Sequence, residues 1–156
     1  MAVTNEQVRA VLDLDEPDYE RAAAEFDRDA IPILRRFVEG GDPNLAAKAA
    51  YLAGRIGDIE AVPILELAAD STDPGVRAAA ATGARHIGSA AEPVLLTLLD
   101  DDDPAVRKTA VRATPPNPGA ELLAKLKVLR DVEPVSMVRE VAADVVDNVS
   151  GGDALQ

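Results

Sequence analysis

The sequence contains no cysteine and no tryptophan, and its 156 residues include only two tyrosines and two phenylalanines. Without cysteine the chain forms no disulfide, offers no thiolate nucleophile and holds no cysteine-bound zinc. Aromatic residues make up 3% of the chain and apolar residues 47%. The core must therefore be built from Ala, Val, Leu and Ile, which suits closely packed helices and predicts a single all-α domain.

Histidine and long apolar runs are also scarce. His86 is the only histidine, so neither a Ser-His-Asp triad nor a multi-histidine metal site is built in the usual way. No run approaches the roughly 18 apolar residues of a membrane span, and the N-terminal residues lack the basic start and apolar run of a signal peptide. We therefore expect a cytoplasmic, non-enzymatic protein with no catalytic residues, cofactor or metal.

Acidic residues outnumber basic ones, with 28 Asp and Glu against 16 Lys and Arg and a net charge of −12. Such a surface repels a phosphate backbone or an anionic membrane on average, so any anion site must be local. The densest acidic run, 100–103, lacks the alternating spacing and turn glycine of a calcium loop. A solvated loop is the favoured interpretation of this run.

An internal repeat of about 30 residues organises the chain. The dipeptide Asp-Pro, with Glu-Pro at its last occurrence, recurs at intervals of 31, 30 and 30 residues: Asp42-Pro43, Asp73-Pro74, Asp103-Pro104 and Glu133-Pro134. A second series of prolines has the same period: Pro32, Pro63 and Pro93. Two independent series with one period indicate a true repeat.

Each Asp-Pro predicts a helix start, because the Asp carboxylate caps free amides and proline suits the first helical position. Helices are expected over 43–57, 74–88 and 104–114 and from 134, the third ending early at the prolines of 115–118. The second proline series predicts another helix in each repeat. Helical hairpins with one apolar stripe per helix must stack, which predicts a solenoid. The first 29 residues are expected to form capping helices over 4–14 and 17–28.

The repeat resembles a known family. The second unit reads DPGVRAAAATGARHIGSAAEPVLLTLLDDDDPAVR and resembles the short bacterial and archaeal HEAT-like repeat, related to the bilin-lyase-type repeats. The resemblance spans about 30–149 and implies a right-handed α-solenoid of about four hairpins. We assign the repeats to 30–57, 60–88, 91–115 and 119–149, within one domain of residues 1–149. The polar, glycine-rich residues 150–156 are expected to form a flexible tail.

The charges divide between the two kinds of helix. The second helices of the hairpins carry basic residues and no acid over their first three copies: Lys48, Arg55, Arg77, Arg85, Arg107, Lys108 and Arg112. In HEAT solenoids the second helix lines the concave side, so the resemblance implies a locally positive concave face on an acidic protein.

A shallow trough is predicted on that face from the helical wheel, with a floor of Ala50, Ala81 and Val111. The residues expected to contact a partner are Tyr51, Arg55, Ala81, Arg85, Lys108, Val111 and Arg112. A second set is expected to be structural: Asp42, Asp73, Asp103, Arg77, Arg107 and Arg139. The resemblance implies that these arginines pair with acids of a neighbouring repeat, for which Asp73 and Asp103 are candidates.

The favoured function is a non-enzymatic adaptor that binds another protein, such as an acidic peptide or helix, because arginines fork onto carboxylates. The alternative is an accessory or catalytic subunit of a bilin-lyase-like or other protein-modification system. Nucleic-acid binding is less favoured, since base stacking requires a platform of aromatic residues that four aromatics do not supply.

Overall fold

The computed structural model describes residues 2–154, with side chains described through residue 151. This part of the chain contains helices and no strand, so the all-α prediction is confirmed. Three short 3-10 helices, η1 (Asp27–Ala30), η2 (Ile59–Ala61) and η3 (Ser89–Ala91), precede α3, α5 and α7. The α-helices are α1 (Asn5–Leu12), α2 (Tyr19–Phe26), α3 (Ile31–Glu39), α4 (Pro43–Ile56), α5 (Val62–Ala69), α6 (Pro74–Ile87), α7 (Glu92–Leu98), α8 (Pro104–Arg112), α9 (Ala120–Val132) and α10 (Ser136–Ala154).

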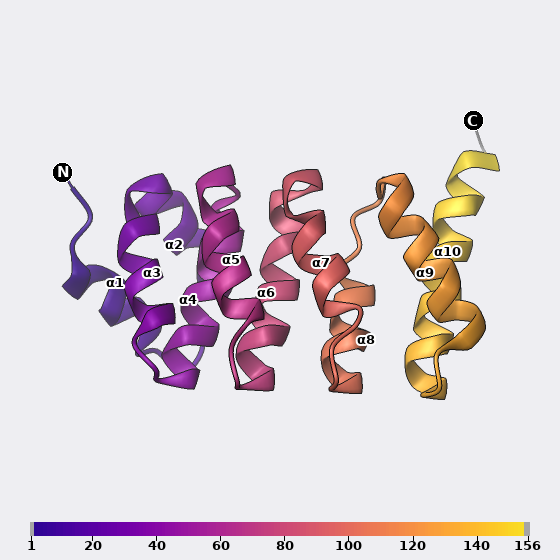
Figure 1. Cartoon of the computed structure of the whole chain (residues 1–156). Coiled ribbons are helices and arrows are strands. Elements are labelled where there is room, and N and C mark those ends of the chain that lie inside the picture. The colour runs from indigo at the N-terminus through magenta and orange to yellow at the C-terminus, as the bar shows by residue number, and fades with distance from the viewer. Residues whose placement is uncertain (1, 155–156) are drawn as a thin grey trace.

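The helices form hairpins stacked in a row, with the two ends of the chain at opposite ends of the stack (Figure 1). We call α3, α5, α7 and α9 the outer layer, because each contacts the next. The inner layer consists of α2, α4, α6, α8 and α10, which likewise contact one another in succession. The predicted arrangement of stacked helical hairpins is confirmed. Between the layers lies a core of alanine, valine and leucine side chains, including the fully buried Leu34, Leu52, Leu65, Leu95 and Leu126.

The Asp-Pro motifs start inner-layer helices, as the sequence predicts. Asp42 accepts a hydrogen bond from the Leu45 amide at 3.1 Å, and Asp73 accepts one from the Val76 amide at 3.1 Å. Asp103 accepts one from the Ala105 amide at 2.7 Å. Each carboxylate therefore satisfies an amide that has no acceptor within its helix.

The third and fourth inner-layer helices depart from the pattern. α4 and α6 have 14 residues each, whereas α8 has 9 and ends at Arg112, two residues before the expected end. α10 starts at Ser136 rather than at 134 and continues to Ala154. It therefore includes 150–154, which the composition assigned to a flexible tail; residues 155 and 156 lie outside the described part.

Two glycines bring α4 and α6 into backbone contact. A Cβ atom added to Gly54 would overlap the Cα of Gly83, and one added to Gly83 would lie 3.1 Å from the carbonyl oxygen of Ala50. Both glycines are buried. The two helices can approach this closely only because neither has a side chain at the crossing point.

Arginines near the starts of α6 and α8 tie each repeat to the next. Arg77 Nε lies 2.7 Å from Asp101 Oδ2, and Arg107 Nη2 lies 2.7 Å from Glu133 Oε1. The prediction that Asp73 or Asp103 would be the partner acid is wrong. Those two carboxylates are engaged by backbone amides, and the loop before the next inner helix supplies the acid instead.

These ion pairs are largely buried, with 8% of the Asp101 side chain and 3% of the Glu133 side chain exposed. Burial alone would raise the pKa of each carboxyl. Hydrogen bonds from Arg77 and a backbone amide to Asp101, and from Arg107 and a backbone amide to Glu133, outweigh burial and lower both pKa values. The carboxylates are therefore held ionised in the folded protein.

We predict that Gly54→Ala lowers the free energy of unfolding by at least about 2 kcal/mol, because the new methyl group forces α4 and α6 apart. Urea unfolding followed by circular dichroism measures the change. Gly151→Ala is the matched control: Gly151 lies in α10 with no atom near an added Cβ, so alanine should stabilise by about 0.5–1 kcal/mol through helix propensity. A fully stable Gly54→Ala protein would contradict the close packing.

We also predict that Glu133→Ala destabilises the protein by about 3 kcal/mol, since it leaves the Arg107 guanidinium buried without its partner. Asp131→Ala, which removes the exposed pair between Arg130 and Asp131, should change stability by no more than about 0.5 kcal/mol. Because the folded-state pKa of Glu133 is lowered, its contribution is present above the usual carboxyl pKa and is lost as the pH falls. Urea titrations at several pH values should show a flatter acid dependence for Glu133→Ala, and equal slopes would contradict the assignment.

Candidate functional site

The predicted floor of the trough is not accessible. Ala50, Ala81 and Val111 are each 0% exposed and belong to the core. The prediction that Ala81 and Val111 contact a partner is therefore wrong. The stacked helices α4, α6 and α8 lie too close together for an accessible floor between them. Apolar side chains fill the lines of contact between adjacent helices, which we call the seams. A partner can reach only the side chains that project beyond the seams.

A row of rings crosses the exposed side of the inner layer from α2 to α6. The Tyr19 and Tyr51 ring centroids lie 4.7 Å apart with the planes at 82°, and those of Tyr51 and His86 lie 5.9 Å apart at the same angle. These are edge-to-face contacts, which are favourable for aromatic pairs. Sequence reasoning selected Tyr51 as a contact residue but not Tyr19 or His86, because the three rings come from different repeat positions.

Two arginines lie close enough to His86 to affect its charge. His86 is exposed at the surface, and partial burial of its ring is the largest cause that lowers its pKa; the positive charges of Arg55 and Arg85 lower it further. The neutral imidazole is therefore favoured. The Nε atom of Arg55 is buried and has no hydrogen-bond partner among the described residues. The aromatic row thus ends in a cluster of positive charge.

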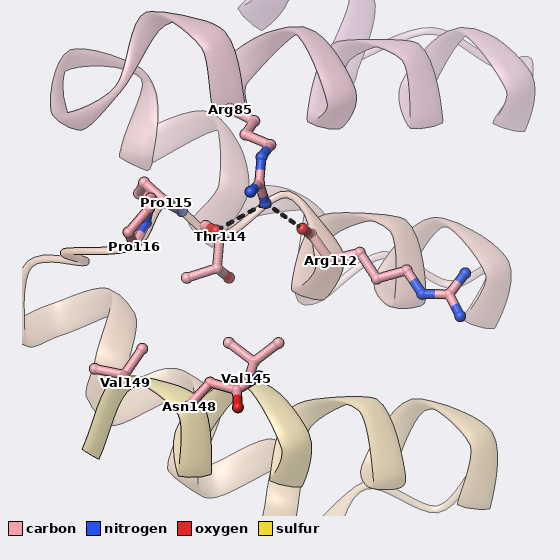
Figure 2. Close-up of a pocket in the computed structure, with 8 residues that line it drawn as sticks. All are labelled: Arg85, Arg112, Thr114, Pro115, Pro116, Val145, Asn148 and Val149. Carbon is pink, nitrogen blue, oxygen red and sulfur yellow. Dashed lines mark hydrogen bonds between the residues drawn. The ribbon is translucent and has the colours of Figure 1, made fainter. Parts of the chain in front are cut away.

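Arg85 also caps the end of α8. Its Nη1 donates to the carbonyl oxygens of Arg112 at 2.8 Å and Thr114 at 3.2 Å (Figure 2). The last carbonyl groups of a helix have no amide donor within the helix. A cationic side chain that donates hydrogen bonds to them is therefore favourable. The side chain is exposed overall. Arg85 therefore has a structural role that the sequence did not reveal, while part of its guanidinium faces solvent.

A cavity of about 260 Å³ opens beside this cap. Figure 2 shows Thr114, Pro115 and Pro116, which follow α8, on one side and α10 on the other, with Arg85 reaching in from α6. Thr114 is 6% exposed, and its buried hydroxyl oxygen has no hydrogen-bond partner among the described residues. The complete lining is Arg85, Arg112, Thr114, Pro115, Pro116, Val145, Asn148 and Val149.

A second cavity of about 250 Å³ shares Arg85 and Arg112 with the first. Its other lining residues are Thr82, Thr109 and Ala113, which come from α6, α8 and the residue after α8. The two cavities together form a track along the inner layer, which we call the α8 groove, lined by the residues of both. Arg112 is exposed, and its side chain runs along the groove away from the prolines (Figure 2).

The remaining predicted residues divide between structure and surface. Lys108 is half-buried, and its Nζ lies 2.8 Å from the sulfur of Met137 in α10. Arg139 Nη1 donates to the Glu133 carbonyl oxygen at 2.7 Å, much as Arg77 and Arg107 bond the loops before their own helices. These ladder arginines are engaged in the fold. Arg55, Arg85 and Arg112 are the predicted arginines that lie outside the ladder.

The profile of the HEAT repeats family matches residues 6–85 and 63–147. Among solved structures, a chain of the complex of CpcE and CpcF of phycocyanin lyase from Nostoc sp. PCC7120 is similar, with a TM-score of 0.64 and 20% identity over 97% of this chain and 67% of that one. An engineered protein is similar with a TM-score of 0.60 and 21% identity, over 95% of this chain and 73% of that one. Such low identity establishes likeness of fold alone.

A search of curated proteins finds no match. Within the described residues, no helix has the length and apolar character needed to cross a membrane. The same part of the chain has no group of three or more acidic or histidine side chains placed to hold a metal ion.

We predict that the His86 pKa, measured by NMR titration of its imidazole signals, lies below the usual value of about 6.5, because of burial and the neighbouring arginines. Since His86 is the only histidine, its signals need no further assignment. Arg55→Gln should raise the pKa, whereas Arg35→Gln on the outer-layer helix α3 should leave it unchanged. A wild-type pKa above the usual value would contradict the cluster of positive charge.

Proposed function

The chain belongs to the HEAT-repeat family, whose members typically bind proteins, and from this premise we propose that it is a non-enzymatic adaptor. Its ligand is an acidic segment of another polypeptide. The binding surface is the exposed side of the inner layer, from the aromatic row to the α8 groove. Tyr51, Arg55, Arg85 and Arg112 are the residues that carry recognition.

The observation that supports this proposal most directly is the placement of charge. The protein has a net charge of −12, yet Arg55, Arg85 and Arg112 lie outside the ladder of ion pairs on one side of the inner layer. A guanidinium group binds a carboxylate through two parallel hydrogen bonds. An acidic segment is repelled by the average charge of the protein and attracted by this group of arginines, which also favours a defined orientation.

The neighbouring rings suit the same ligand. Tyr19 and Tyr51 are half-buried and held by edge-to-face contacts, so little side-chain entropy is lost when a partner covers them. They offer apolar surface beside the positive charge of Arg55. A peptide with both acidic and apolar side chains uses both features.

The size of the cavities favours a peptide over a large cofactor. The two cavities of the α8 groove measure about 260 and 250 Å³, whereas pockets for drug-sized ligands are usually about 300–1,000 Å³. A tetrapyrrole, which the bilin-lyase-like alternative requires, exceeds either cavity. Visible absorbance of the purified protein separates the alternatives: we expect a colourless protein, and a bound pigment would favour the modification system.

The main test selects ligands from a random peptide display library against the immobilised full chain. We expect the enriched peptides to be acidic and their affinity to fall with added salt. Arg112→Glu should weaken binding by at least about tenfold, because it reverses an exposed charge in the groove while leaving the cap from Arg85 to the main chain in place. Its melting temperature should stay close to that of the wild type.

Arg36→Glu is the matched control, since Arg36 is an exposed arginine of the outer-layer helix α3. The same reversal there should change affinity by less than about twofold after correction for net charge. Enrichment of peptides without acidic residues, or equal losses for the two variants, would contradict binding on the inner layer.

A further inference from the structure

We propose that the end of the α8 groove is an anchoring pocket for one aliphatic side chain of the partner, with an acidic residue of the same segment held by Arg112 and Arg85. This inference rests on the proposed function and specifies its ligand. The partner segment places an aliphatic residue within one or two positions of the acid.

The pocket exists because α8 is short. The prolines at 115, 116 and 118 cannot continue the helix, and α8 stops after 9 residues where α4 and α6 have 14. α10 continues opposite the missing turns with Val145, Asn148 and Val149. A helical turn that would have packed on α10 is absent, and the cavity occupies its place (Figure 2).

The lining suits an aliphatic side chain attached to a peptide backbone. Pro115, Pro116, Val145 and Val149 provide apolar surface on both sides of the cavity. The unpartnered hydroxyl of Thr114 can accept a hydrogen bond from a peptide amide or donate one to a peptide carbonyl. A volume of about 260 Å³ is below the usual range for whole small-molecule ligands, about 300–1,000 Å³, and accommodates one branched side chain with its adjoining backbone.

The position of the arginines fixes where the acid lies. Arg85 is held by the carbonyl oxygens of Arg112 and Thr114, so its guanidinium is already ordered before binding. Both arginines line both cavities of the groove, which places positive charge directly beside the apolar pocket. A carboxylate next to the anchored side chain therefore meets a guanidinium without further rearrangement of the chain.

The probe for the test is the tightest peptide from the library selection, labelled with fluorescein and measured by fluorescence polarisation on the full chain. Asn148→Trp places a large ring in the pocket and changes no charge. We expect this variant to weaken binding by at least about tenfold. Ser150→Trp, an exposed neighbour in α10 that does not line the cavity, should change affinity by less than about twofold.

A peptide in which alanine replaces the aliphatic residue should lose a similar factor on the wild type and little more on Asn148→Trp, since the pocket is then already blocked. Circular dichroism confirms that the variants are folded. A second measurement needs no substitution: peptide addition to the wild type should shift the NMR methyl signals of Val145 and Val149 and leave those of the exposed Val128 and Val132 in place.

The outcomes separate the two proposals. Suppose that Arg112→Glu loses binding. If Asn148→Trp then binds fully, or if the Val145 and Val149 signals do not shift, the pocket proposal is overturned and the acidic-segment adaptor proposal is retained. Binding that is unaffected by Arg112→Glu would overturn the adaptor proposal itself. Loss of binding in both variants, with shifted valine methyl signals, supports the pocket.

Discussion

The contact between Gly54 and Gly83 is the constraint on which the exposed side of the inner layer depends. Without side chains at this crossing, α4 and α6 meet backbone to backbone. Tyr51 and Arg55 flank the first glycine in the sequence, and Arg85 and His86 follow the second. Close packing at the seam therefore brings an aromatic ring, an imidazole and two guanidinium groups of different repeats together on one surface.

Arginine serves two purposes in this fold, and position decides between them. Arg77 and Arg107 lie where each can reach both the loop before its own helix and an acid about one repeat later. Their charges are neutralised within the protein and fix the spacing of the repeats. Arg55, Arg85 and Arg112 lie nearer the ends of their helices and have no carboxylate partner among the described ion pairs. Arg85 combines both purposes, because one nitrogen caps α8 while the side chain borders the groove.

A local break in the repeat creates the feature of the surface that differs most from the regular units. Three prolines shorten α8, and the shortening leaves carbonyl groups that Arg85 satisfies and a cavity opposite α10. A regular third repeat would have placed a helical turn there. The same departure that weakens the repeat pattern in the sequence thus produces a cavity bordered by positive charge on an acidic protein.

The sequence by itself determined the all-α stack, the starts of α4, α6 and α8 and the basic character of these three helices. These features follow from short-range chemistry. Asp42, Asp73 and Asp103 each cap an amide within three residues, and the Asp-Pro motif recurs at a regular interval, so the same helix start forms in each repeat. The tertiary structure alone decided which acids pair with Arg77 and Arg107, that Ala81 and Val111 are buried, and that Arg85 caps a helix 27 residues away. Those outcomes depend on the distance and offset between neighbouring hairpins. The close approach of backbones in adjacent hairpins decides which side chains remain exposed, and the helical wheel of one helix contains no information on that distance.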